Sequence, residues 1–190
     1  GLRAERMRLK TELDRLYPEY GALVEPKPAA IDDVRRALAP EEALVSIYVT
    51  ASRVHAWAFR SSGPVALASI EVDEREIAEL VARLRRSVEV DDGGLDSLRP
   101  FDTAAAQRLF DLVLRPVEAG WRDARTLLVV PHRSLAQIPF ALLATGPAPD
   151  ATPSGALFEQ YRTVPWLIRK LAIVQLPTAQ TLLSLRSARP

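Results

Sequence analysis

The chain has 190 residues, of which 48% are hydrophobic and 26% are charged, as in an ordinary soluble globular domain. Its net charge of +1 provides no global field that would attract nucleic acid or an anionic membrane. The absence of cysteine excludes disulfide bonds, thiolate metal sites and a cysteine nucleophile within this chain. No apolar run approaches the roughly 20 residues of a membrane span, and we expect a cytoplasmic protein.

The first thirty residues indicate a helix followed by an extended segment. Leu9, Leu13, Leu16 and Tyr17 recur at helical spacing over residues 2–17, and a proline follows. The segment GALVEPKPAA, residues 21–30, is typical of a proline-stiffened connector. The chain begins Gly-Leu-Arg without an initiator methionine, so we expect a piece of a longer protein.

Three strand-like runs follow a short helix that carries Ile31, Val34 and Leu38 on one side. The runs are joined by short turns and cover residues 43–49, 53–59 and 65–72. Bulky side chains occupy both faces of the middle run. The pattern therefore predicts an antiparallel meander that is at least partly covered on both faces.

Two helices are predicted next. Asp73, with Glu76 in a capping-box spacing, begins the first, whose apolar stripe contains Ile77, Leu80, Val81, Leu84 and Val88. Residues 91–100 are expected to form a loop. The second helix starts near Asp102 and ends at Gly120, with a kink or break at Pro116.

The last third contains two more strands. Leu127 to Val130 is a continuous apolar run, typical of a strand that is buried on both faces. Residues 144–156 are expected to be a mobile surface loop, and residues 171–177 a strand. The closing helix is capped by a threonine and is expected to pack through Leu182, Leu183 and Leu185. This order of elements predicts an α/β fold around one mixed sheet flanked by helices.

His132 and Ser134 follow the buried run and raise the question of a nucleophile with its base. Alternate loop positions rarely point two side chains at each other, and no carboxylate is placed to orient the base. We therefore interpret this stretch as a polar turn, and a Ser-His hydrolase as an alternative. His55, beside Trp57, lacks further metal ligands at a recognisable spacing, so packing is the expected role.

Nucleotide and nucleic-acid binding are also disfavoured. Neither GxGxxG nor GxxxxGK[ST] occurs, so we expect no cofactor. The arginines that invite a nucleic-acid interpretation have no stacking aromatic residues among them and are expected to form solvated faces: Arg35, Arg36, Arg83, Arg85 and Arg86. A nucleotide-binding α/β domain stays an alternative that ligand-dependent thermal stabilisation would reveal.

Three stretches in combination resemble the CHAT domain, a caspase-like and separase-like domain often attached to tetratricopeptide repeats. Residues 38–59 resemble the family's opening strand and hairpin. The stretch LLVVPHRSLAQIPFALL, residues 127–143, resembles its "l-iVPdg-L--lPf-aL" core, and residues 164–185 resemble its "yLie-y-v-y-PSa--L" segment. The family-motif positions with an expected structural role are Pro131, Leu135, Pro139, Phe140, Pro177 and Thr178.

The resemblance implies a cysteine peptidase whose histidine and cysteine belong to later motifs of the family, "HlatHG" and "sAC". Neither motif is present, so no catalytic residue is carried over to this chain. His132 stands where relatives often have aspartate, and Thr178 where they have serine. Residues 21–190 would then be the N-terminal, non-catalytic half of a caspase-like domain, and residues 1–20 the junction to an upstream helical repeat.

The expected partners follow from this resemblance. They are the catalytic half of the same parent, the upstream repeats, and the parent's protein or peptide substrate, with no nucleic acid and no membrane. The arginine-rich, lysine-poor composition is typical of a GC-rich bacterial genome. The alternative is a stand-alone protein-interaction module without enzymatic activity, for which we expect a monomer with no open sheet edge.

Overall fold

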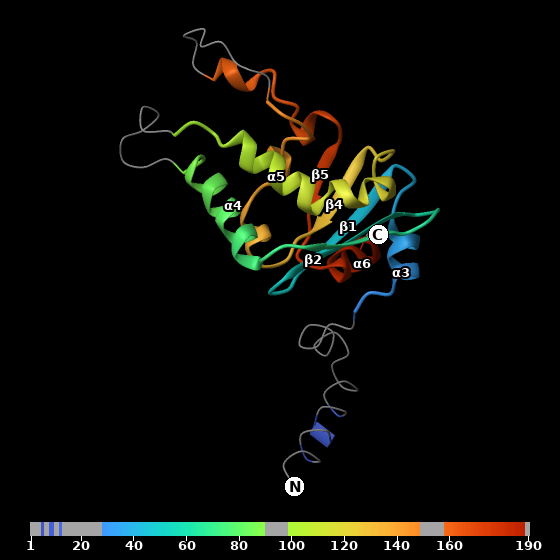
Figure 1. Ribbon diagram of the computed structural model, residues 1–190. Helices are drawn as coiled ribbons and strands as arrows, with labels where there is room; N and C mark the ends of the chain where they lie inside the picture. Colours follow the sequence, from blue (N-terminus) through green and yellow to red (C-terminus); the bar gives the residue numbers. More distant parts are fainter. Residues whose placement is uncertain are drawn as a thin grey trace.

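One five-stranded sheet organises the part of the chain that the computed structural model describes, namely residues 28–89, 99–148 and 158–188 with Glu5, Arg8, Leu9 and Glu12. The strand order is β3-β2-β1-β4-β5 (Figure 1). The strands are β1 (Glu42–Val49), β2 (Arg53–Arg60), β3 (Ala66–Glu71), β4 (Thr126–Val130) and β5 (Ala172–Gln175).

The sheet is mixed. β1 pairs antiparallel with β2, and β2 pairs antiparallel with β3, which confirms the predicted meander. β4 returns from the two following helices to lie parallel to β1, and β5 lies parallel to β4. Leu127, Leu128 and Val129 are buried at the centre of the sheet, as their unbroken apolar run predicted.

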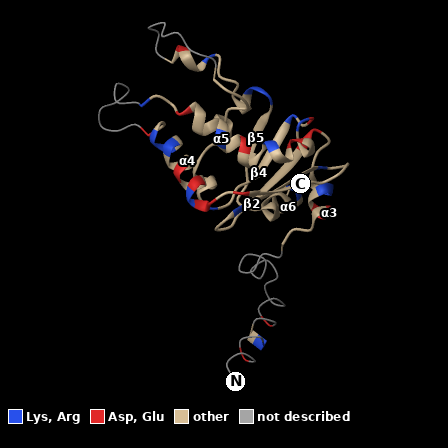
Figure 2. Cartoon of the chain, in the orientation of Figure 1, with Lys and Arg blue, Asp and Glu red and all other residues tan. Residues whose placement is uncertain are grey.

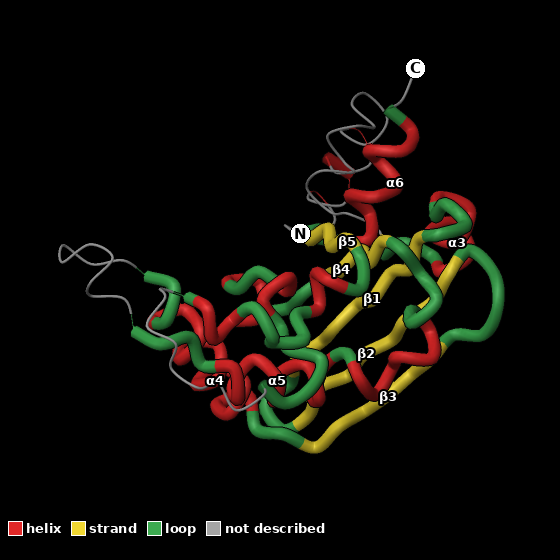
Figure 3. The backbone as a smooth tube through the Cα atoms, turned by 90° about the horizontal axis from the view of Figure 1, so that it is seen from above, coloured by secondary structure: helices red, strands yellow, loops and turns green. Residues whose placement is uncertain are grey.

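The larger core lies between one face of the sheet and the helices that follow the meander (Figure 3). These are α4 (Glu74–Arg86), α5 (Thr103–Val113) and the 3-10 helix η2 (Arg115–Gly120). The predicted break at Pro116 is confirmed, since α5 ends and η2 begins before it. At Gly120 the backbone approaches β2 so closely that an added Cβ would lie 2.4 Å from the carbonyl oxygen of Ala58.

Helices α3 (Ile31–Ala37) and α6 (Ala179–Ser187) cover part of the opposite face (Figure 3). A second apolar cluster joins them to the sheet and contains Val34, Leu38, Leu44, Phe59, Leu128, Leu176 and Leu182. The described residues thus form a helix–sheet–helix arrangement. This confirms the predicted α/β fold with a mixed sheet flanked by helices.

Several details of the helices differ from the expectation. Asp73 caps α4 by accepting a hydrogen bond from Arg75 N, but Glu76 bonds Arg108 and does not close a capping box. Val88 lies beyond the end of α4 and is 46% exposed, and Leu185 on α6 is 59% exposed. Ile31, at the start of α3, is also largely exposed, because α3 buries only Val34 within its length.

Short 3-10 helices fill the remaining described segments: η3 (Arg133–Gln137), η4 (Phe140–Leu142), η5 (Glu159–Tyr161) and η6 (Leu167–Arg169). Most of the predicted helix at 2–17 and most of the loops expected at 91–100 and 144–156 lie outside the described residues. Among the described helices, none has the length and apolarity needed to cross a membrane.

Candidate functional site

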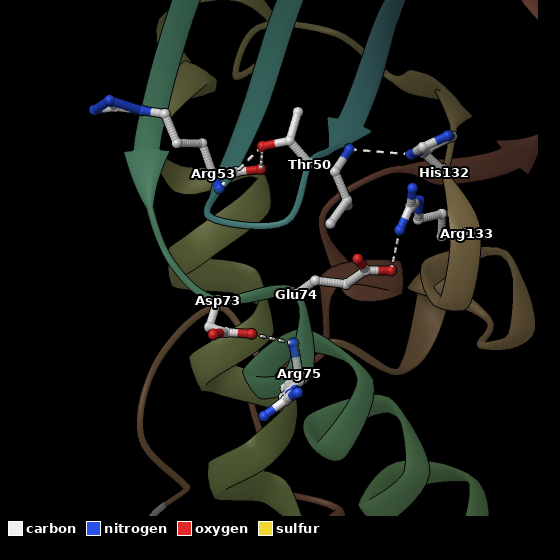
Figure 4. A network of polar contacts seen from close by, with 8 residues as sticks. Thr50, Arg53, Asp73, Glu74, Arg75, His132 and Arg133 are labelled. Carbon is white, nitrogen blue, oxygen red and sulfur yellow. Dashed lines mark hydrogen bonds and ion pairs between the residues drawn. The ribbon is translucent and has the colours of Figure 1, made fainter.

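The loop after β4 lies against the end of β1, because the two strands are parallel neighbours (Figure 4). The backbone N–H of Val49 donates a hydrogen bond to Nδ1 of His132 over 3.1 Å. The His132 ring also stacks on Tyr48, with ring centroids 4.4 Å apart. An accepting Nδ1 places the ring proton on Nε2. The hydrogen bond and the stacking together hold the loop to the end of β1.

Arg133 makes the second attachment of the same loop. Its φ of 55° lies in the left-handed region, which is uncommon for a residue with a side chain. The guanidinium contacts the carboxylate of Glu74 at the start of α4 (Figure 4). The loop is therefore tied to β1 on one side and to α4 on the other.

His132 and Ser134 are not brought together. Ser134 lines a cavity of about 390 Å³ between α4 and η3, beside Arg85 and Gln137. His132 lines a different groove, and no hydrogen bond or ion pair links it to a carboxylate within the described part of the chain. The nucleophile–base–carboxylate geometry that a hydrolase requires is missing here.

The groove at His132 lies at the carboxyl ends of the three parallel strands, where open α/β sheets commonly bind ligands. It measures about 310 Å³ and is lined by β1, β2 and α6 residues together with prolines 28, 131 and 177. Its polar and aromatic lining is formed by Ser46, Tyr48, Trp57, His132, Thr178 and Gln180. Among the described residues, no acidic side chain lines it.

Sequence reasoning identified His132, Pro131 and Thr178 but missed Ser46 and Tyr48. These two residues come from a strand more than eighty positions earlier. Only the placement of β4 beside β1 brings them to the groove. Only the topology could have indicated them, because the carboxyl ends of parallel neighbours such as β1 and β4 lie at the same edge of a sheet.

Three of the six family-motif positions, Pro131, Pro177 and Thr178, line the groove at His132, and the structure places the other three elsewhere. Leu135 and Phe140 are fully buried, and the Phe140 N–H donates to Oε1 of Gln175 on β5. Pro139 precedes the short helix η4, as expected of a proline at a helix start. Thr178 caps α6 by accepting from the Thr181 N–H at 3.2 Å.

Four of the five arginines singled out from the sequence bind within the chain. Arg83 pairs with Asp102, whose other oxygen caps α5 through the Ala105 N–H. Arg85 bonds both Gln137 and Glu89. On α3, Arg35 donates to the Gly63 carbonyl and Arg36 pairs with Asp33. On α4 acidic side chains lie in the first turn and basic ones in the last turn (Figure 2), where Arg83 pairs with Asp102 and Arg85 with Glu89.

His55 lies half-buried on β2, across from Tyr48 on one neighbouring strand and Ser69 on the other. In the described ranges, no group of three or more histidine, aspartate or glutamate side chains is close enough to hold a metal ion. The residues beside His55 are those of the neighbouring strands, as for any residue in the middle of a sheet.

Comparison with known families identifies one relation. Residues 103–190 match the model of the CHAT domain, from the start of α5 to the end of the chain. The match includes both later stretches that carried the resemblance and confirms it there, while residues 38–59 lie outside the match. No curated protein and no solved structure matches this chain.

Proposed function

We propose that this chain is the non-catalytic, N-terminal part of a bacterial CHAT-domain protein and scaffolds a caspase-like cysteine peptidase half. The family match over residues 103–190 supports the relation, and the lack of cysteine removes the nucleophile from this chain. Residues 1–20 remain the expected junction to upstream helical repeats. Any peptide cleavage would belong to the parent protein.

The open edge of β5 carries this proposal. Ala172 and Leu176 donate their N–H groups toward β4, to Arg125 and Val129. By alternation, the N–H and C=O groups of Ile173 and Gln175 point away from β4, where the described sheet has no further strand. Parallel strands are normally buried, yet three of the four β5 residues are exposed. The unpaired N–H and C=O groups of such an edge can form hydrogen bonds with a further strand.

Apolar side chains near this edge agree with a missing neighbour. Val174 on β5 is 42% exposed, and Ile168 just before it is 57% exposed. β5 is followed by α6, the order of elements with which a β-α-β unit would begin. Because β1 occupies the other side of β4, the next parallel strand would be added beside β5.

A charge placed at this edge tests the proposal in the parent protein. We expect Val174→Lys to lower cysteine-dependent peptide cleavage by at least about tenfold, since burying an unpaired ammonium costs more than about 1.4 kcal/mol. Ile31→Lys on α3, an exposed residue away from the edge, is the matched control. Cleavage unchanged by Val174→Lys, or cleavage by the 190-residue chain alone, would contradict the proposal.

A stand-alone interaction module is the second candidate, and the groove at His132 favours it. Trp57 and Tyr48 provide apolar surface, and Ser46 and Gln180 provide hydrogen-bonding groups, a combination suited to a short extended peptide. A stand-alone module was expected to be a monomer with no open sheet edge, and the open edge of β5 in the described sheet disagrees with that expectation. If it holds, Trp57→Ala abolishes peptide binding to the isolated chain while Val174→Lys has no effect on it.

A further inference from the structure

The outer edge of β3, at the opposite end of the sheet from β5, is a second open strand edge in the described part of the chain. The Val72 N–H donates to the Ser52 carbonyl, which continues the β2–β3 ladder. In an antiparallel ladder the bonded pairs alternate. Ala66, Ala68 and Ile70 therefore bond β2, and the main chain of Leu67, Ser69 and Glu71 faces outward.

The side chains along this edge are neutral and partly apolar. Leu67 is 74% exposed and lies across from Trp57 of β2, and Val65 is 39% exposed. Glu71, the one charged residue of β3, pairs with Arg53 of β2, which also donates to the Ser69 hydroxyl. Natural edge strands are usually protected by lysine, proline or an inward charge. Residues 65–70 contain none of these.

We propose that β3 pairs antiparallel with β3 of a second copy of this chain, about a two-fold axis at Leu67. Leu67 then lies opposite the partner's Leu67, and Ser69 lies opposite the partner's Val65. Outward main-chain groups of one strand meet those of the other. Glu71 of each copy stays away from its counterpart, so the edge is self-complementary in both hydrogen bonding and charge.

The choice of a second copy over another protein's strand follows from this neutrality. The one charged residue of β3, Glu71, is already paired with Arg53, so the strand presents little that would select a charged partner, and a net charge of +1 gives little repulsion between copies. The two edges are at opposite ends of the sheet (Figure 3). A dimer through β3 is therefore compatible with a strand added beside β5, and each can hold without the other.

Sedimentation velocity on the 190-residue chain tests the dimer, from about 1 μM to about 1 mM, the range in which an interface below standard size dissociates. We expect a monomer–dimer equilibrium that Leu67→Lys weakens by at least about tenfold, as two opposed ammonium groups repel. Leu185→Lys, at a leucine on α6 that is also exposed (59%, against 74% for Leu67), should dimerise like the wild type. Circular dichroism establishes that each variant is folded.

Cross-linking tests the register, because a chain without cysteine accepts a single added thiol. We expect Leu67→Cys to be joined into a covalent dimer by a short bismaleimide, and Leu185→Cys to stay largely monomeric. A wild type that is monomeric at all concentrations would overturn the proposal. So would a dimer that Leu67→Lys leaves intact, or one that Leu185→Lys dissolves.

Discussion

The backbone N–H of Val49 is bonded to Nδ1 of His132 across 3.1 Å, and this bond joins the carboxyl ends of β1 and β4. Val49 is 1% exposed, so its N–H is buried in the folded chain and has the ring nitrogen as its acceptor. A residue that resembles a catalytic base in the sequence thus serves as a hydrogen-bond acceptor for the backbone. The same loop reaches α4 through Arg133 and Glu74.

His132→Ala should lower the free energy of unfolding by about 2 kcal/mol, because a buried N–H loses its acceptor and Tyr48 loses its stacking partner. His132→Asn retains an acceptor oxygen and should cost about half as much. Urea denaturation measures both values. Equal losses for the two variants would show that the acceptor is not what matters.

The left-handed backbone at Arg133 predicts an unusual preference for glycine. Arg133→Gly and Arg133→Ala both remove the contact with Glu74, so their difference isolates the backbone. We expect the glycine variant to be the more stable by about 1 kcal/mol, the cost of a side chain in the left-handed region. An alanine variant of equal or higher stability would contradict the observed conformation.

The close approach of η2 to β2 predicts that Gly120→Ala destabilises the fold by about 2 kcal/mol or more, because the added methyl meets the Ala58 carbonyl at 2.4 Å. Gly146→Ala is the control, since its nearest contact would be 3.8 Å away. That variant should remain within about 0.5 kcal/mol of wild type. Comparable thermal unfolding of the two variants would be the contrary result.

Ser134 should not react with a fluorophosphonate probe, since no base among the described residues is hydrogen-bonded to its hydroxyl and His132 lines a different cavity. Mass spectrometry of the treated chain checks this at the residue. Labelling of Ser134 that disappears in His132→Ala would restore the Ser-His hydrolase alternative.

Much of the fold could be predicted from local pattern. The apolar stripe from Ile77 to Leu84 and the cap at Asp73 defined α4, because helical spacing and a capping carboxylate are local signals. The unbroken run at residues 127–130 likewise indicated a strand buried on both faces. Turn and proline signals placed the boundaries of the meander and the break at Pro116.

The missed features are those that depend on the assembled sheet. No local pattern states that β4 lies between β1 and β5, so Tyr48 and Ser46 were not identified as neighbours of His132. Leu185 was expected to pack, but α6 covers the sheet only through the side that holds Leu182. The left-handed conformation at residue 133 could not be predicted, because the residue there is an arginine and not the glycine that usually indicates such a conformation.

Hydrogen exchange at the outer edge of β5 tests the central proposal most directly, because the amides of Ile173 and Gln175 face away from β4. Their exchange is measured in the 190-residue chain and in the parent protein under the same conditions. The scaffold account predicts fast exchange in the chain alone and strong protection in the parent. Equally fast exchange at both amides in the parent would contradict it.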